Sequence, residues 1–78
     1  MEKPVLDLDQ LELNGIRIYD AHKQGRQVSV KYFYKNQFHE ITCSIIKPMG
    51  VWDMDVKCSN NDEKMTIPFN WIVQVEWM

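Results

Sequence analysis

The side chains of this sequence that could carry chemistry are two histidines and two cysteines, His22, His39, Cys43 and Cys58. They are four potential zinc ligands, but no pair has the Cys-x-x-Cys or His-x-x-x-His spacing of zinc sites. His39 and Cys43 would lie on the same side of one strand, too far apart for the direct hydrogen bond of a nucleophile and its base. The sequence therefore predicts no metal site and no covalent catalysis.

Two further groups of residues are of the types that serve catalysis or cofactor binding. Asp53 and Asp55 would lie about 7 Å apart on one strand face, a separation that a glycosidase pair could have. Alternating acids are also typical of a solvated strand, and that is the expected role here. Gly15, Gly25 and Gly50 are isolated, so there is no glycine-rich phosphate loop. We expect no cofactor, and the protein is predicted not to be an enzyme.

Length and composition indicate one small globular domain. A chain of 78 residues supports a single core, and 45% hydrophobic with 26% charged residues is an ordinary globular composition. The formal charge of -2 gives no general attraction to nucleic acid or anionic lipid. No apolar run approaches the roughly 18 residues of a membrane span, and no export signal is evident. We therefore expect a cytoplasmic protein without membrane contact, whose two cysteines stay reduced.

The elements that must position these residues begin with a helix. Residues 1–13 have no period long enough to assign and are expected to form a tail or edge segment. A helix is predicted over Gly15–Lys23, with Asn14-Gly15 marking its start. Gly25 can adopt the positive φ that a helix end commonly needs. Residues 14–78 would then form the folded domain.

After Arg26 the apolar period changes from helical to two, which predicts five short strands. In the third strand, Trp52, Met54, Val56 and Cys58 would point inward. A short turn of 3₁₀ helix fits Phe69–Ile72, because Pro68 ends the fourth strand. The predicted strands are Val28–Lys35, Phe38–Ile46, Val51–Cys58, Met65–Ile67 and Val73–Trp77.

One helix followed by five strands, with a helical turn before the last strand, is the order of elements in SH3-like and Sm-like barrels. Closing such a sheet removes edges that would otherwise be open to aggregation. The predicted fold is therefore mostly β with one N-terminal helix, as a small five-stranded SH3/Sm-like barrel.

Three stretches carry a resemblance to a known family. Val28–Asn36 matches a "hydrophobic-x-Tyr-Tyr-Lys-Asp" hairpin, Ile41–Ile45 matches a "Gly-Thr-Ile" strand, and Thr66–Glu76 matches an "Ile-Pro-Phe-Asp-Asp-Ile" close. In these stretches, between Arg26 and Trp77, the chain resembles the YolD-like proteins of Firmicutes and their phages. Ile46–Trp52 is similar to the "Glu-Pro-x-Gly" turn and aromatic strand of WYL domains. Either resemblance implies an SH3/Sm-like barrel.

The resemblance also carries an expectation about function. YolD-like proteins are associated with error-prone Y-family DNA polymerases and the SOS response, and WYL domains are regulatory modules. Both imply a regulatory adaptor and not an enzyme. The absence of a catalytic constellation, and more aromatic side chains than a 78-residue core is expected to bury, favour an adaptor that binds a protein partner. Trp71 is the expected anchor, because an exposed Trp is a typical source of binding energy. The partner-binding residues are thus predicted as Trp71, Asn70 and Phe69, unless Trp71 folds back over the end of the barrel.

The sequence is also compatible with two alternative functions. In an RNA- or single-stranded-DNA-binding protein, Tyr32, Phe33 or Tyr34 would stack on bases while nearby cations follow the phosphates. Phe33 shares a strand face with two of these cations, unless it packs under the helix. The residues of this alternative site are Arg26, Lys31, Phe33 and Lys35. The second alternative is self-association through the hydrophobic last strand, which would give a homo-oligomer.

Overall fold

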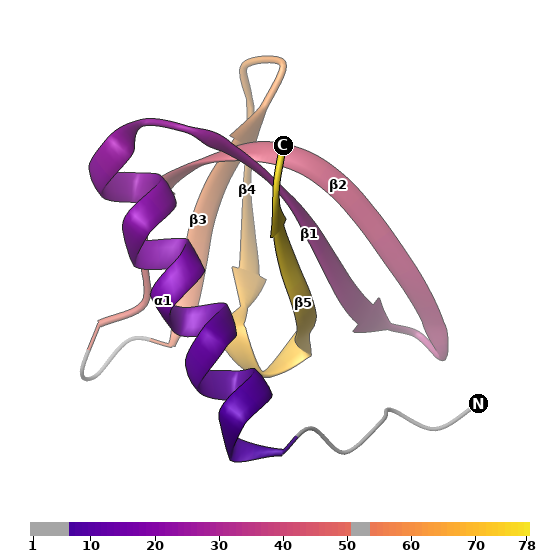
Figure 1. Ribbon diagram of the computed structural model, residues 1–78. Coiled ribbons are helices and arrows are strands. Elements are labelled where there is room, and N and C mark those ends of the chain that lie inside the picture. Colours follow the sequence, from indigo (N-terminus) through magenta and orange to yellow (C-terminus); the bar gives the residue numbers. More distant parts are fainter. Residues whose placement is uncertain (1–6, 51–53) are drawn as a thin grey trace.

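The computed structural model describes residues 7–50 and 54–78 and contains one helix and one curved sheet (Figure 1). The helix, α1, spans Leu8–Gln24 and precedes every strand. The strands are β1 (Gln27–Tyr34), β2 (Gln37–Lys47), β3 (Asp55–Asn60), β4 (Glu63–Pro68) and β5 (Ile72–Trp77), with the 3₁₀ helix η1 (Phe69–Trp71) before β5. All strand pairs are antiparallel, in the order β4-β3-β2-β1-β5. The prediction of a mostly β protein with an N-terminal helix is confirmed.

The helix begins at Leu8 and not at Gly15, so residues 8–13 belong to α1 and not to a tail. The Asp7 side chain caps it by accepting a hydrogen bond of 2.8 Å from the Gln10 amide. The predicted end is right, because Gly25 follows the helix with a φ of 66°. Residues 1–6 lie outside the described residues.

Asn14-Gly15 does not start the helix because tertiary packing requires both residues inside it. Asn14 is fully buried, and its side-chain oxygen accepts a hydrogen bond of 2.9 Å from Gln10. At Gly15, a Cβ atom would lie 3.4 Å from the Met49 methyl carbon and 3.9 Å from the Phe69 ring. Gly15 therefore lies inside α1 against Met49 and Phe69, at distances that are ordinary van der Waals contacts for a Cβ atom.

Two tight hairpin turns connect neighbouring strands. Lys35 and Asn36 join β1 to β2 with φ values of 52° and 61°. Asn61 and Asp62 join β3 to β4 with φ values of 51° and 67°. Positive φ at both central residues is the signature of the type I′ turn, whose twist matches that of the flanking strands. Both turns fall at the junctions between the predicted strands.

The third strand begins later than predicted. β3 starts at Asp55, and Met54, predicted to point inward, is 52% exposed. The Met54 carbonyl instead accepts a hydrogen bond of 2.8 Å from the Phe69 amide, which ties the segment before β3 to the end of β4. Val56 and Cys58 point inward as predicted, each 1% exposed. The prediction for Trp52 lies outside the described residues.

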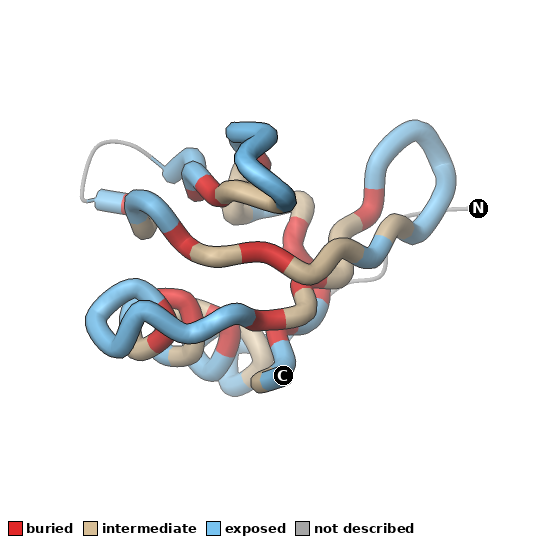
Figure 2. Tube along the Cα trace, turned by 90° about the horizontal axis from the view of Figure 1, so that it is seen from above, coloured by how far each residue is buried: buried red, intermediate tan, exposed pale blue. Residues whose placement is uncertain are grey.

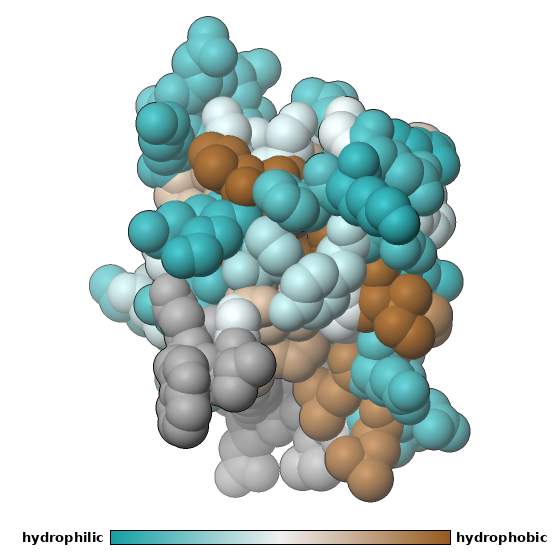
Figure 3. Space-filling model, turned by 90° about the vertical axis from the view of Figure 1, so that its left-hand side faces the viewer, coloured by the Kyte–Doolittle hydropathy of each residue, from teal (hydrophilic) through white to brown (hydrophobic). Residues whose placement is uncertain are grey.

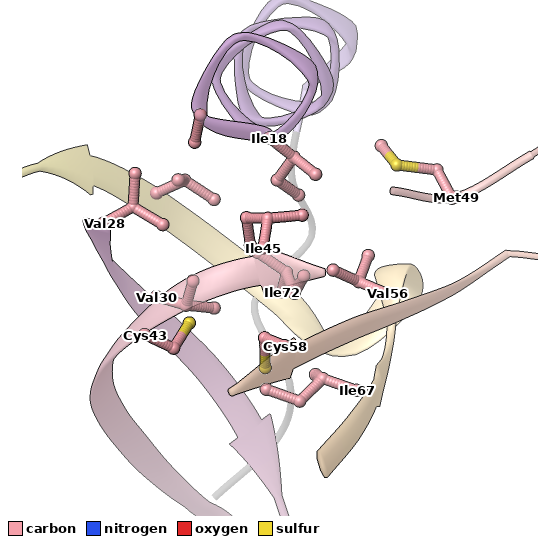
Figure 4. Packing of buried hydrophobic residues seen from close by; sticks show 12 residues of the cluster. Ile18, Val28, Val30, Cys43, Ile45, Met49, Val56, Cys58, Ile67 and Ile72 are labelled. Carbon is pink, nitrogen blue, oxygen red and sulfur yellow. The ribbon is translucent and has the colours of Figure 1, made fainter. Parts of the chain in front are cut away.

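The core lies between α1 and the inner face of the sheet. Buried positions gather toward the centre of the strands, and the turns are exposed (Figure 2). Ile18 points from the helix toward Ile45 and Ile72, and Val56 and Ile67 extend the cluster across the sheet (Figure 4). Burial of such side chains contributes about 1.5–3 kcal/mol each.

Polar contacts fix the helix on the sheet. Arg17 donates a hydrogen bond of 2.6 Å to the Val75 carbonyl of β5, and His22 Nδ1 lies 3.2 Å from the Ile45 carbonyl of β2. The Tyr19 hydroxyl donates to the Met49 carbonyl in the loop after β2. Among the described residues, no helix combines the length and the apolar character needed to cross a membrane.

The sheet is open, so the expected closed barrel is not confirmed. Within residues 7–50 and 54–78, the strand pairings run from β4 to β5 and include none between these two. Each outer strand is protected in another way: α1 reaches β5 through Arg17, and β4 ends in Pro68, which has no amide proton to donate. Closure would remove the exposed edges of the sheet. Because these two features already limit pairing at the edge strands, the sheet can stay open.

Candidate functional site

Four aromatic side chains meet where the β1–β2 hairpin extends past the core. We call Tyr32, Tyr34, His39 and Trp71 the aromatic cluster. Tyr34 and Trp71 stack with ring centroids 4.6 Å apart and planes 23° apart. Tyr32 and His39 stack at 5.1 Å and 18°, and His39 reaches Tyr34 at 6.2 Å. The cluster is therefore one continuous row of rings that joins the hairpin to η1.

Strand register explains why these rings lie together. The two-residue turn places Tyr34 opposite Gln37 and Tyr32 opposite His39. Residues directly opposite each other share a face, so Tyr32, Tyr34 and His39 continue the inner face of the hairpin beyond the core. Trp71, at the end of η1, then lies against the ring of Tyr34.

The cluster is accessible but held in place. Tyr34 is 38% exposed, while Tyr32, His39 and Trp71 are half-buried. His39 Nε2 lies 3.3 Å from the Tyr34 carbonyl, which accepts its hydrogen bond in the tautomer that carries a proton there. Lys35 Nζ lies 5.3 Å from the Tyr34 ring centroid, within the range of a cation–π contact. Rigid, partly exposed aromatic rings beside a cation can bind an apolar side chain, a base or a carboxylate.

The residues predicted for partner binding occupy the η1 end of this surface. Trp71 packs partly against the core and stacks on Tyr34. It is half-buried, so it is neither a fully exposed anchor nor fully folded back over the end of the sheet. Asn70 is exposed, and Phe69 is half-buried against the core. Trp71 and Asn70 are thus available at the surface, while Phe69 mainly supports η1.

The residues of the alternative nucleic-acid site are spread along β1. The Arg26 guanidinium lies 4.7 Å from the Trp77 ring centroid at one end, and Lys35 lies at the other end beside Tyr34. Lys31 Nζ is 4.9 Å from the ring of Phe38, on the outer face of the hairpin. Phe33 is only 8% exposed, so the ring expected to stack on bases is covered. Only Lys35 joins the aromatic cluster.

The four potential metal ligands are not brought together. The His22 ring is within hydrogen-bond distance of the Ile45 carbonyl of β2, and His39 lies in the aromatic cluster. Of the four residues, only Cys43 and Cys58 contact each other. Among the described residues, no group of three or more His, Cys, Asp or Glu side chains could hold a metal ion. Cys43 and Cys58 are free and buried, on neighbouring strands of the core (Figure 4). Hydrogen bonding to Cys58, together with burial, raises the pKa of the Cys43 thiol.

Sequence reasoning missed His39 as a member of the site, because it considered this residue only as a zinc ligand or as a base for Cys43. The signal was available in the turn. If Lys35 and Asn36 alone form the turn, Tyr32 must pair with His39, and the aromatic row follows. The contact of Tyr34 with Trp71 joins residues distant in the sequence, and no local pattern predicts it.

Comparisons with known proteins agree with the resemblance found in the sequence. The family model of the YolD-like proteins matches residues 1–76, and so includes α1 as well as the stretch that starts at Arg26. A comparison with curated proteins found no match, and neither did one with solved structures. The chain belongs to the YolD-like protein family.

Proposed function

We propose that this protein is a small, non-catalytic regulatory adaptor that binds a protein partner through the aromatic cluster. The observation that carries the proposal is the Tyr34–Trp71 stack, in which a partly exposed Tyr ring is held rigidly by its neighbour. Aromatic rings fixed before binding lose little conformational entropy and present a large contact area, which is why Tyr and Trp dominate binding hot spots. Asn70 and Lys35 would supply polar contacts at the rim.

The wider setting is part of the same proposal. The five-stranded sheet would be related to the SH3/Sm-like barrels but left open between β4 and β5, and the helix-first order and η1 between β4 and β5 support this relation. The YolD-like family supports an origin in bacteria or their phages. The family resemblance also suggests a cytoplasmic role linked to DNA repair and the SOS response.

Affinity capture with matched variants tests the proposal. Tagged wild-type protein and the Tyr34→Ala, Trp71→Ala and Phe38→Ala variants are used on nuclease-treated bacterial lysate, and retained proteins are identified by mass spectrometry. Phe38 is the control because it is 39% exposed, close to Tyr34, but lies on the outer face of the hairpin. We expect a protein retained by wild type and Phe38→Ala and lost from both cluster variants. Retention by all four, with each variant folded, would contradict the proposal.

A second candidate function is single-stranded nucleic-acid binding at the same cluster. The observation that favours it is Lys35, whose ammonium lies over the Tyr34 ring and could move to a phosphate when a base stacks there. Binding of a mixed-sequence oligonucleotide that weakens with salt and is lost in Tyr34→Ala would support this candidate. The acidic net charge of -2 and the buried Phe33 place it second.

A further inference from the structure

The outward face of α1 carries an apolar stripe that the fold leaves uncovered. Leu13, Ile16 and Tyr19 follow each other at intervals of three residues, and they are 38%, 50% and 48% exposed. We call these three residues the helix stripe. Hydrophobic atoms run down this side of the molecule between hydrophilic ones (Figure 3). A row of residues three apart forms the kind of ridge that packs into the groove of a second helix.

Carboxylates flank the helix stripe. Asp9 and Glu12 precede Ile16, and Asp20 follows it, all on the outward side of α1. None of the three has an ion-pair or hydrogen-bond partner among the described residues. Lys23 is the one basic residue on this side of the helix, so the rim of the stripe is predominantly acidic.

This charge pattern selects among the possible occupants. If two copies packed their stripes antiparallel about Ile16, Glu12 of each copy would face Asp20 of the other, and like charges would oppose the contact. Anionic lipid and nucleic acid are disfavoured by the same carboxylates. A helix with an apolar face bordered by Lys or Arg could pack its apolar side chains against the helix stripe and pair its cations with the carboxylates.

We infer that the helix stripe is a second docking surface, which takes a basic amphipathic helix of a partner protein. It lies on a different element from the aromatic cluster and involves none of its residues. The protein could therefore hold two partners, or two segments of one partner, at the same time. This inference does not depend on the aromatic cluster binding anything.

The test uses a synthetic helical peptide on the full chain. The probe has about 16 residues, with Leu at positions i, i+3, i+4 and i+7 and Lys elsewhere. Two control peptides have Glu in place of Lys, or the same composition in scrambled order. Amide shifts in ¹⁵N NMR titrations map the binding site. We expect a Kd of about 1 mM or tighter for the probe alone, with the largest shifts at Leu13, Ile16 and Tyr19.

Variants separate the stripe from the rest of the surface. Leu13→Ser/Ile16→Ser should weaken probe binding at least about tenfold, and Glu12→Gln/Asp20→Asn about threefold, with less dependence on salt. Ile46→Ser, which changes an Ile of β2 that is 42% exposed, and Trp71→Ala should bind like wild type. The inference is overturned if no probe binding is detected, if either control peptide binds as well, or if the shifts map to the hairpin.

Discussion

At the scale of single residues, the two thiols show most directly how burial sets chemistry. Cys43 and Cys58 are 0% and 1% exposed, and they contact each other rather than a base or a metal ligand. Cys58 lies opposite Ile45, so Cys43 is its diagonal neighbour across β2 and β3. Diagonal Cα atoms are about 7–8 Å apart in a sheet, which is long for a disulfide. Their inward position was predictable from the period-two pattern, and their contact was not.

This arrangement predicts that both thiols are inert in the folded protein. The raised pKa of Cys43 disfavours its thiolate, and burial blocks access to both sulfur atoms. With Ellman's reagent at about pH 8, below the ordinary pKa of about 8.5 for a thiol, we expect almost no reaction until denaturant is added. Both thiols should then react. Rapid modification of one or both in native buffer would show that the pair is not buried as described.

At the scale of elements, the start of α1 is determined by tertiary packing and not by local helix propensity. Gly15 has a poor helix propensity and favoured a later helix start, but it lies inside α1 where Met49 and Phe69 approach closely. Gly25 obeys the local rule, because its positive φ ends the helix. The strands and turns were more predictable, since alternation and turn composition are local signals. The bulge in β5 opposite Lys31 and Tyr32, which changes the register, was not.

The two glycines give opposite predictions for the same substitution. Gly15→Ala should raise the free energy of unfolding by about 0.5–1 kcal/mol, because the new methyl group meets only the flexible end of Met49 at 3.4 Å. Gly25→Ala should lower it by about 1 kcal/mol, because alanine is strained at a φ of 66°. Urea denaturation of both variants measures the difference. A destabilising Gly15→Ala would mean that the helix cannot accommodate even a methyl group there.

At the scale of the whole molecule, α1 completes a sheet that does not close on itself. It covers the inner face with Ile18 and reaches the outer strand β5 with Arg17. Sequence reasoning predicted the order of elements but also a closed barrel, because it could not foresee that a helix would protect an edge strand. The sequence likewise predicted only part of the candidate site, because some of its contacts form only in the complete fold. Trp71 could be identified from its type and position, but its contact with Tyr34 depends on the complete fold.

The role of Arg17 leads to a prediction about the whole fold. Arg17→Met keeps most of the apolar stem but removes the hydrogen bond to the Val75 carbonyl, so it should lower the free energy of unfolding by about 1 kcal/mol. Amide hydrogen exchange in β5 should accelerate more than in β3. Lys64→Met, an exposed basic residue on β4, is the control and should change little. Equal effects of the two substitutions would remove Arg17 from the account of how α1 docks.

The most direct test of the central claim, that the aromatic cluster is a protein-docking surface, is site-specific photocrosslinking. A p-benzoylphenylalanine at position 34 would lie in the cluster, and the same residue at position 38 would lie on the outer face of the hairpin. After irradiation in nuclease-treated bacterial lysate, we predict one discrete protein adduct from position 34 and none from position 38. Equal adducts from both positions, or none from position 34, would contradict the claim.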